Sequence, residues 1–222
     1  MLKTIGLLIA IYCLAFLCSC QKEIEPYTDI PSDSTDTTSA SGGYMPLTAG
    51  TYWVYRDSAS GETDTATVLD EQWLNNDINY TKVHLSADDT YSYYGVKDHS
   101  YYLYGEQDGM TVTMQVLNDT ASIGNSWVYD MGDINGVPAK GTGTVVEKLS
   151  TYTVQGETYT DVLHTQYVLT YTILGTDTDF ATYNFYFAKG KGIIKVTSTV
   201  ADITGTGNDM IDTQDLVDYQ IK

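Results

Sequence analysis

The chain has 222 residues, with 29 acidic against 11 basic side chains and a formal net charge of −18 at pH 7. A surface of that sign repels phosphate backbones and anionic headgroups, which argues against nucleic-acid binding. All three cysteines fall within the first twenty residues, so the rest of the chain has no thiol for a disulfide or a cysteine metal site. We therefore expect the rest to be stabilised by an apolar core.

Residues 1–19 are predicted to be a lipoprotein signal peptide. Lys3 supplies a positive start, and the apolar run from Ile5 to Leu17 is too short for a membrane span but has the length of a secretory signal. The run ends in Leu17-Cys18-Ser19-Cys20, which reads as a lipobox. We expect cleavage before Cys20 and lipid attachment to Cys20. The acyl chains would then anchor the protein to a membrane, which is its predicted partner.

Residues 20–43 are predicted to be a disordered tether. Ser, Thr, Asp, Pro and Gly dominate from Gln21 to Gly43, and large apolar residues are almost absent. The start of this segment, residues 21–25, resembles the acidic signal that follows the lipidated cysteine in surface-exposed lipoproteins of Bacteroides-like bacteria. That resemblance implies an outer-membrane protein on the cell surface; an ordinary polar linker is the alternative.

Residues 44–222 are predicted to form a single all-β domain. Tyr and Thr, which favour pleated surfaces, are abundant, and short stretches alternate between apolar and polar residues. Predicted strands include 52–55, 63–69, 80–85, 111–117, 144–149, 167–173, 183–187 and 193–200. Predicted turns lie at 60–61, 75–76, 108–109, 135–136, 155–156 and 205–207. We expect about a dozen antiparallel strands, little or no helix, and a strongly curved sheet that closes as a barrel or a sandwich.

The chain contains an approximate internal repeat. Gly50–Tyr55 resembles Gly124–Tyr129, Tyr80–His84 resembles Tyr159–His164, and an aromatic hairpin follows each pair. The fixed order suggests two related meanders in one sheet system, and chance reuse of similar strands is the alternative. The tryptophans at matching positions, residues 53 and 127, are expected to fill the same interior.

Two motifs resemble a family of uncharacterised Bacteroides-type lipoproteins. Residues 46–55, PLTAGTYWVY, look like the family's opening PL-x-x-G-x-Y-W-x-Y, and residues 187–195, FAKGKGIIK, resemble its late Y-A-K-G-V-G-L-V-K hairpin. Lys191 departs from the pattern, which usually has an apolar residue there. The resemblance covers nearly the whole folded part and implies an envelope lipoprotein, with no catalytic residues to carry over.

Side chains suited to catalysis or metal binding are few and poorly spaced. His84, His99 and His164 show neither H-x-x-x-H nor H-x-H spacing, and the chain has no G-x-S-x-G motif. His84 and His164 occupy equivalent places in the repeat, which leaves open either a shared site or two separate strand-end histidines. We predict no catalytic residue, no metal ligand and no cofactor.

Acidic side chains gather before the end of the chain, at Asp202, Asn208, Asp209, Asp212 and Asp215. We expect them to lie in a flexible acidic loop before the last strand. Calcium binding is the alternative, although the spacing misses the pattern of a calcium-binding loop.

A dense group of tyrosines supplies the candidate ligand-binding residues. Six fall within fourteen residues: Tyr91, Tyr93, Tyr94, Tyr101, Tyr102 and Tyr104. Alternation would place Tyr94, Tyr102 and Tyr104 together on one sheet face, with Tyr91, Tyr93 and Tyr101 on the other. An exposed aromatic face can stack on sugar rings or on a partner's apolar surface; cross-strand pairs that only cover the sheet are the alternative.

These features predict a non-catalytic, monomeric lipoprotein that binds a glycan or a protein partner. One alternative is a carrier of lipids or other apolar ligands, which would need an apolar cavity inside a half-open barrel. The other is an envelope hydrolase using paired carboxylates, which glycosidase chemistry places about 5–10 Å apart in a cleft.

Overall fold

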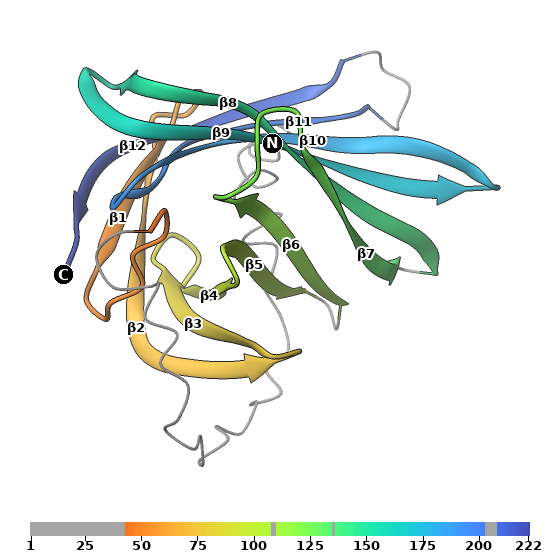
Figure 1. Cartoon of the computed structure of the whole chain (residues 1–222), viewed down its shortest axis with the longest axis horizontal. Helices are drawn as coiled ribbons and strands as arrows, with labels where there is room; N and C mark the ends of the chain where they lie inside the picture. The colour runs from red at the N-terminus through yellow and green to blue at the C-terminus, as the bar shows by residue number, and fades with distance from the viewer. Residues whose placement is uncertain (1–42, 108–109, 135, 203–207) are drawn as a thin grey trace.

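The computed structural model describes residues 43–107, 110–134, 136–202 and 208–222, and across these it consists of strands and turns (Figure 1). The strands are β1 (Tyr52–Asp57), β2 (Thr63–Asn75), β3 (Ile78–Leu85), β4 (Thr90–Lys97), β5 (Ser100–Gln107), β6 (Met110–Asn118), β7 (Ser126–Ile134), β8 (Val137–Val154), β9 (Glu157–Ile173), β10 (Thr176–Ala188), β11 (Gly192–Val200) and β12 (Met210–Gln220). Cys20, the predicted signal peptide and nearly all of the predicted tether lie outside the described residues. So do the turns predicted at 108–109 and 205–207 and residue 135.

All twelve strands belong to one antiparallel sheet, in the order β6-β5-β4-β3-β2-β1-β12-β11-β10-β9-β8-β7. Each half is a six-stranded meander, and the halves join where β1 pairs with β12. The first and last strands therefore lie in the middle of the sheet, while β6 and β7 form its edges. The sheet curls until β6 packs against β7, β8 and β9 (Figure 1). The predicted all-β, strongly curved antiparallel sheet is confirmed, and its shape is that of a nearly closed barrel.

The two meanders begin in the same way. The Gly50 N–H donates to the Val68 carbonyl oxygen at 2.9 Å, and the Gly124 N–H donates to the Val145 carbonyl oxygen at 2.8 Å. Both glycines have nearly the same positive φ, 83° and 82°, a conformation that favours glycine over other residues. The matching sequence motifs thus open structurally matching halves.

No described helix is both long and apolar enough to traverse a bilayer.

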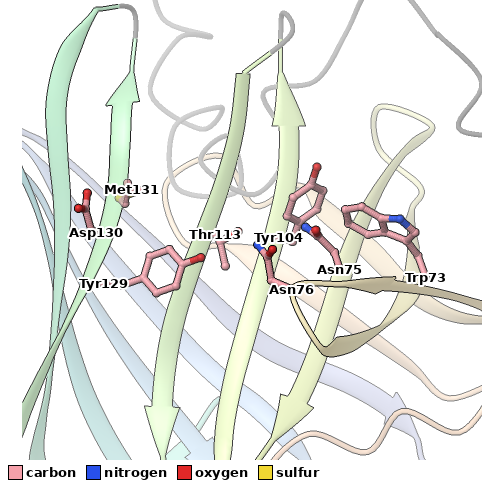
Figure 2. A pocket seen from close by; sticks show the side chains of 8 residues that line it. All are labelled: Trp73, Asn75, Asn76, Tyr104, Thr113, Tyr129, Asp130 and Met131. Atoms are coloured by element: carbon pink, nitrogen blue, oxygen red, sulfur yellow. The ribbon is translucent and has the colours of Figure 1, made fainter.

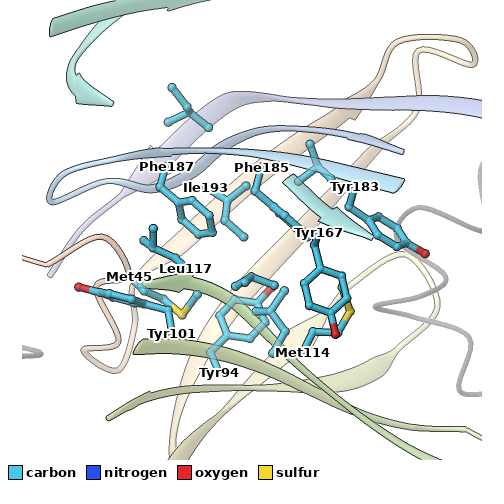
Figure 3. Close-up of a cluster of buried hydrophobic side chains, with 14 of the residues drawn as sticks. Met45, Tyr94, Tyr101, Met114, Leu117, Tyr167, Tyr183, Phe185, Phe187 and Ile193 are labelled. Carbon is cyan, nitrogen blue, oxygen red and sulfur yellow. The ribbon is translucent and has the colours of Figure 1, made fainter. Parts of the chain in front are cut away.

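The main core lies inside the curve and takes large side chains from both halves (Figure 3). Six of its large side chains are at most 2% exposed: Trp53, Tyr167, Tyr183, Phe185, Phe187 and Leu117. Each buried aromatic ring removes about 150–250 Å² from water. The Trp53 indole N–H donates to the Lys191 carbonyl oxygen at 2.6 Å, which satisfies the one polar atom of that side chain.

Lys191, which stands where the resembling motif usually has an apolar residue, is half-buried in the turn at 189–191. Its ammonium lies 4.6 Å from the centre of the Tyr219 ring, where a cation is attracted to the π face. The long methylene stem can cover apolar surface while the charge remains in water. The lysine is therefore compatible with the packing of the hairpin.

Trp127 does not fill the interior beside Trp53, so that expectation is wrong. It is only half-buried and lies over Gly143 of β8, where any β-carbon would overlap the indole ring. Its N–H donates to the Gln115 carbonyl oxygen of β6 at 2.7 Å. This hydrogen bond from β7 to β6 links the two edge strands of the sheet. The environment of Trp53 differs because its strand, β1, lies at the centre of the sheet.

A second, smaller cluster covers the opposite face of the first meander. Ile78, Tyr80 and Tyr104 are buried in it, and Trp73, Tyr93 and Tyr102 pack against them. A bulge in β2 between Val68 and Gln72 shifts the register, so that Trp73 becomes the partner of Tyr80 in β3. Bulges bend a strand and re-aim its side chains, and this one turns the β2–β3 tip over β5.

Candidate functional site

The tyrosine group is divided between two sheet faces differently from the prediction. A two-residue turn, Asp98-His99, has positive φ at both positions and sets Lys97 opposite Ser100. This register places Tyr94 opposite Leu103 and Tyr93 opposite Tyr104. Directly opposed residues share a face, so Tyr102 and Tyr104 lie with Tyr93, and Tyr101 lies with Tyr94.

Tyr94 therefore does not belong to the same surface as Tyr102 and Tyr104. It is 6% exposed in the main core, with its ring centre 6.4 Å from that of Trp53, and burial raises its pKa. Tyr104 lies in the second cluster, and Tyr102 is half-buried beside it. Of the three predicted ligand-binding tyrosines, Tyr104 reaches the candidate site.

That site is a pocket of about 400 Å³ between the β2–β3 tip and the edge strands β6 and β7 (Figure 2). We call it the seam pocket. It is lined by Trp73, Asn75, Asn76, Tyr104, Thr113, Tyr129, Asp130 and Met131. Trp73 and Tyr104 form one wall, with ring centres 4.8 Å apart at a steep angle. Tyr129 projects from β7 on the other side of the pocket, and the Asp130 side chain leaves the strand on the face away from Tyr129 (Figure 2).

The seam pocket exists because the two edges of the sheet approach without a ladder between them. The sheet ends at β6 on one side and at β7 on the other, and the Trp127–Gln115 hydrogen bond ties them together at one level. Beyond that contact, a bulge in β7, between Asp130 and Gly132, interrupts the pairing of β7 with β8. Tyr129 and Met131 project from one face of β7 toward the pocket, and Asp130, which is paired with Lys140 of β8, lies between them with its side chain on the other face.

The remaining wall is the tip of the β2–β3 hairpin. Asn76 and Asp77 have φ of 50° and 59°, the pair of left-handed residues that a tight two-residue hairpin turn requires. The sequence predicts this turn one residue earlier, at 75–76, but Asn75 still pairs with Ile78. The turn holds the Asn75 and Asn76 amides at the mouth of the pocket (Figure 2). Tyr129 ends the second copy of the repeated motif, and this signal in the sequence could have pointed to β7. The closeness of Tyr129 to Trp73 could not be predicted from the sequence.

The histidines do not form a shared site. His84 lies opposite Tyr91 in the ladder and 2.8 Å from Asp89. His164 lies opposite Tyr186, with the two rings stacked 4.2 Å apart. Each histidine thus pairs with a tyrosine of the next strand in its own meander, which supports two separate, structurally equivalent positions. His99 contacts Asp119 at 2.9 Å.

Two carboxyl groups do come together, at the junction of the two meanders. Asp57 of β1 and Asp212 of β12 are 2% and 6% exposed and hydrogen-bond to each other. The Gln214 amide donates to both carboxyl groups, at 3.2 and 3.3 Å. Burial and this contact with Asp57 raise the pKa of Asp212 to about 7. Burial also opposes ionisation of Asp57, but the bond to Asp212 and the N–H groups of Ser60 and Ala59 hold the Asp57 pKa below its usual value.

The expectation of an acidic loop is wrong for Asp212 and Asp215, because both lie within β12 and both are buried. Asp215 accepts hydrogen bonds from the Lys195 ammonium at 3.0 Å and from the Gln155 amide at 2.7 Å. Asp202 and Asp209 flank residues 203–207, which are not described, and the Asp202 N–H donates to the Asp209 carboxylate at 3.1 Å. In the described part of the chain, no group of three acidic, histidine or cysteine side chains could hold a metal ion.

Comparisons with known proteins give no family: no protein-family model and no curated protein matches the chain. Among solved structures, a predicted lipoprotein from Parabacteroides distasonis has a TM-score of 0.49 at 11% identity, covering 81% of this chain and 99% of that one. A predicted exported protein with a YmcC-like fold from Bacteroides fragilis has a TM-score of 0.48 at 10% identity, with the same two coverages, 81% and 99%.

The hypothetical lipoprotein YmcC from Escherichia coli has a TM-score of 0.35 at 10% identity, covering 79% of this chain and 86% of that one. These descriptions name lipoproteins and an exported protein, and they name no activity. Likenesses this distant do not assign a function to the chain.

Proposed function

We propose that this chain is a lipid-anchored envelope protein whose β domain binds a glycan, without catalysis, in the seam pocket. The observation that carries this proposal is the lining itself: three aromatic rings beside two amides and a hydroxyl. Aromatic faces stack on the C–H faces of sugar rings, and amide and hydroxyl groups bond to sugar hydroxyls. A volume of about 400 Å³ lies in the usual range for small-ligand sites.

Binding is favoured over hydrolysis by the placement of the acids. Glycosidases need two carboxyl groups about 5–10 Å apart across a cleft. Asp57 and Asp212 instead hydrogen-bond to each other and are nearly shut off from solvent. Asp130 is the one acidic residue among those that line the seam pocket.

The lipid-carrier alternative has less support. A carrier needs an apolar cavity inside the curve of the sheet. In this protein the large aromatic side chains of both meanders occupy that space (Figure 3). The seam pocket is partly polar and lies at the sheet edges, which suits a sugar better than an acyl chain.

The anchor is supported by the lipobox ending at Cys20, and the acidic start of the tether favours the outer membrane and the cell surface. We expect Cys20→Ala to move the protein from the membrane fraction to the soluble fraction. Cys13→Ala, within the predicted signal peptide, should leave it in the membrane fraction. Persistence of Cys20→Ala in the membrane would refute the lipid anchor, and resistance to protease added to intact cells would refute surface exposure.

Glycan binding is tested with the full-length protein in a detergent that has neither a sugar nor an amine headgroup. A glycan array selects ligands, and calorimetry then compares variants. Tyr129→Ala removes one aromatic wall and should weaken binding about tenfold, the scale of one stacking contact. Tyr91→Ala is the matched control, because Tyr91 packs beside His84, away from the pocket. Absence of glycan binding, or full affinity in Tyr129→Ala, would overturn the proposal.

A further inference from the structure

The tip of the β9–β10 hairpin carries the most exposed large apolar side chain of the described residues. Leu174 is fully exposed, at 101%, and its neighbour Ile173 is 51% exposed. The pairing of β9 with β8 ends at Tyr171, and that of β10 with β11 begins at Ala181. Beyond these residues the two strands pair only with each other, so the apolar tip formed by Ile173 and Leu174 stands clear of the rest of the sheet (Figure 1).

The turn at this tip is unfavourable for a leucine. Leu174 and Gly175 are the central residues of a two-residue hairpin turn, with φ of 52° and 82°. Three other two-residue turns with positive φ at both positions begin with a polar residue: Asn76, Asp98 and Gln155. The left-handed conformation is unfavourable for a bulky side chain such as leucine. Both the backbone and the exposure of Leu174 therefore oppose folding, which indicates a role outside the fold.

The end of the hairpin has no unpaired charge, although the chain is acidic. Residues 171–178 include one charged side chain, Asp177, which forms an ion pair with Lys140. The Asp177 carboxylate also accepts a hydrogen bond from the Thr172 hydroxyl at 2.7 Å. An apolar environment can therefore receive the apolar tip without desolvating an unpaired charge.

An aromatic pair lies behind the apolar tip. Tyr171 and Phe180 are half-buried, with ring centres 5.3 Å apart and rings nearly perpendicular. Tyr171 precedes Leu174 by three residues, which places it about 10 Å behind the end of the hairpin. Aromatic rings are enriched where the apolar core of a membrane meets water, and interfacial segments bury their apolar part about 5–10 Å deep. The spacing therefore fits shallow insertion into a bilayer.

We propose that the apolar tip inserts shallowly into the bilayer that holds the lipid anchor at Cys20. The chain enters the described domain at Gly43, whose carbonyl oxygen accepts the Gly190 N–H at 2.7 Å, at the opposite end of β10 from the tip. β10 has 13 residues and spans about 43 Å. The 23 residues that follow Cys20 up to Gly43 can span up to about 75 Å, so the anchor and the apolar tip can reach the same bilayer.

A bilayer suits the apolar tip better than a protein partner does. Stable protein interfaces bury about 800 Å² on each side, which is far more than two side chains supply. A membrane contact needs no such area, because the anchor already holds the domain at a high effective concentration near the surface. A second copy of this chain is disfavoured, because both copies carry a formal charge of −18. The inference rests on the proposed lipid anchor and is independent of glycan binding.

The test uses the full-length lipidated protein in vesicles of phosphatidylcholine, whose headgroup has no net charge. Thr176→Cys, beside the apolar tip, is labelled with a small fluorophore, and quenching by lipids with a nitroxide on the acyl chain reports insertion. Ile123→Cys is the matched control, since Ile123 is exposed and precedes β7, which runs parallel to β9, at the opposite end of the sheet. We expect strong quenching at residue 176 and little at residue 123.

Leu174→Asn separates membrane contact from folding. Asparagine tolerates positive φ better than leucine does, and a fully exposed side chain has no contact to lose, so the unfolding temperature should stay equal or rise. Loss of the inserted leucine should lower the ratio of inserted to free tip about tenfold, measured as lost quenching at residue 176. Leu74→Asn, which removes an exposed leucine from the β2–β3 hairpin, should leave the quenching unchanged.

The outcomes separate this contact from the anchor. Quenching at residue 176 no stronger than at residue 123, or unchanged quenching in Leu174→Asn, would overturn the inference. Quenching that requires a second protein in the vesicles would also overturn it and would assign the apolar tip to a protein partner. If Cys20→Ala is soluble while quenching is absent from the lipidated protein, the anchor stands and the contact of the tip with the bilayer is refuted.

Discussion

The carboxyl pair at the meander junction predicts an unusual dependence of stability on pH. The Asp212 pKa is about 7 in the folded protein, against an ordinary value of 3.8. The folded state therefore keeps a proton that the unfolded chain releases as the pH rises from about 4 to 7. Stability should fall across this window and level off above it, because a raised carboxyl pKa penalises the ionised folded state.

The perturbation is Asp212→Asn. One pKa unit corresponds to about 1.4 kcal/mol, so a shift of this size gives at most about 4 kcal/mol. Water entry and local relaxation reduce that value, and we expect the wild type to lose about 2–4 kcal/mol between pH 4.5 and 8 through this group. An asparagine amide can still donate to the Asp57 carboxylate but cannot ionise. The variant should therefore equal or fall slightly below the wild type at pH 4.5 and exceed it at pH 8.

The assay is urea unfolding followed by tryptophan fluorescence at several pH values from 4.5 to 8. All other titratable groups are common to both proteins, so subtracting the two stability curves isolates Asp212. Asp218→Asn, an exposed carboxylate of the same strand, should give a curve parallel to the wild type. Parallel curves for wild type and Asp212→Asn would refute the reasoning, since the proton would then not reside on the buried pair.

Three further predictions concern packing and the sheet edges. Trp53→Phe should cost more free energy of unfolding than Trp127→Phe, by about 1–2 kcal/mol, because Trp53 is 1% exposed and Trp127 is half-buried; equal costs in urea unfolding would contradict the assignment of Trp127 to the seam. Gly141→Ala should lower the free energy of unfolding by about 2–4 kcal/mol, since a β-carbon there would overlap the Tyr167 ring. The double variant Gly141→Ala with Tyr167→Leu should lose less free energy of unfolding than the sum of the two single variants. Strict additivity of the two losses would count against the overlap. Backbone amides of β1 and β12 should exchange with deuterium more slowly than those of β6 and β7, because the former pair is central and the latter strands are edges; the reverse order would mean that the sheet closes elsewhere.

The strands and the sheet type could be predicted from the sequence because they depend on local alternation. The repeated Gly-x-x-Trp motif also predicted two meanders, whose first strands are β1 and β7. The last strand was harder to recognise. Asp212, Gln214 and Asp215 look like solvated loop residues, and their burial depends on Asp57, which is 157 positions away from Gln214. No local pattern contains that partner.

The site failed to emerge from the sequence for a related reason. Assigning faces to the tyrosines requires the turn register, and the two-residue turn at Asp98-His99 moved Tyr94 and Tyr104 to opposite faces. The bulge in β2 shifts the register again and brings Trp73 to the pocket. A one-residue shift reverses every side chain that follows it, so the pocket depends on details that composition and periodicity do not contain.

The pairing of β1 with β12 has a consequence for how the chain acquires its structure. Each meander can form from contacts between neighbouring segments, but the ladder at the centre joins the two ends of the domain and needs β12 to be present. Contacts of such long sequence separation slow folding. Until β12 is added, both β1 and β11 have an open edge, and open edges invite pairing with other chains. The step that completes the domain is therefore the joining of its centre, and a chain that lacked its last strand would be left with two half-sheets.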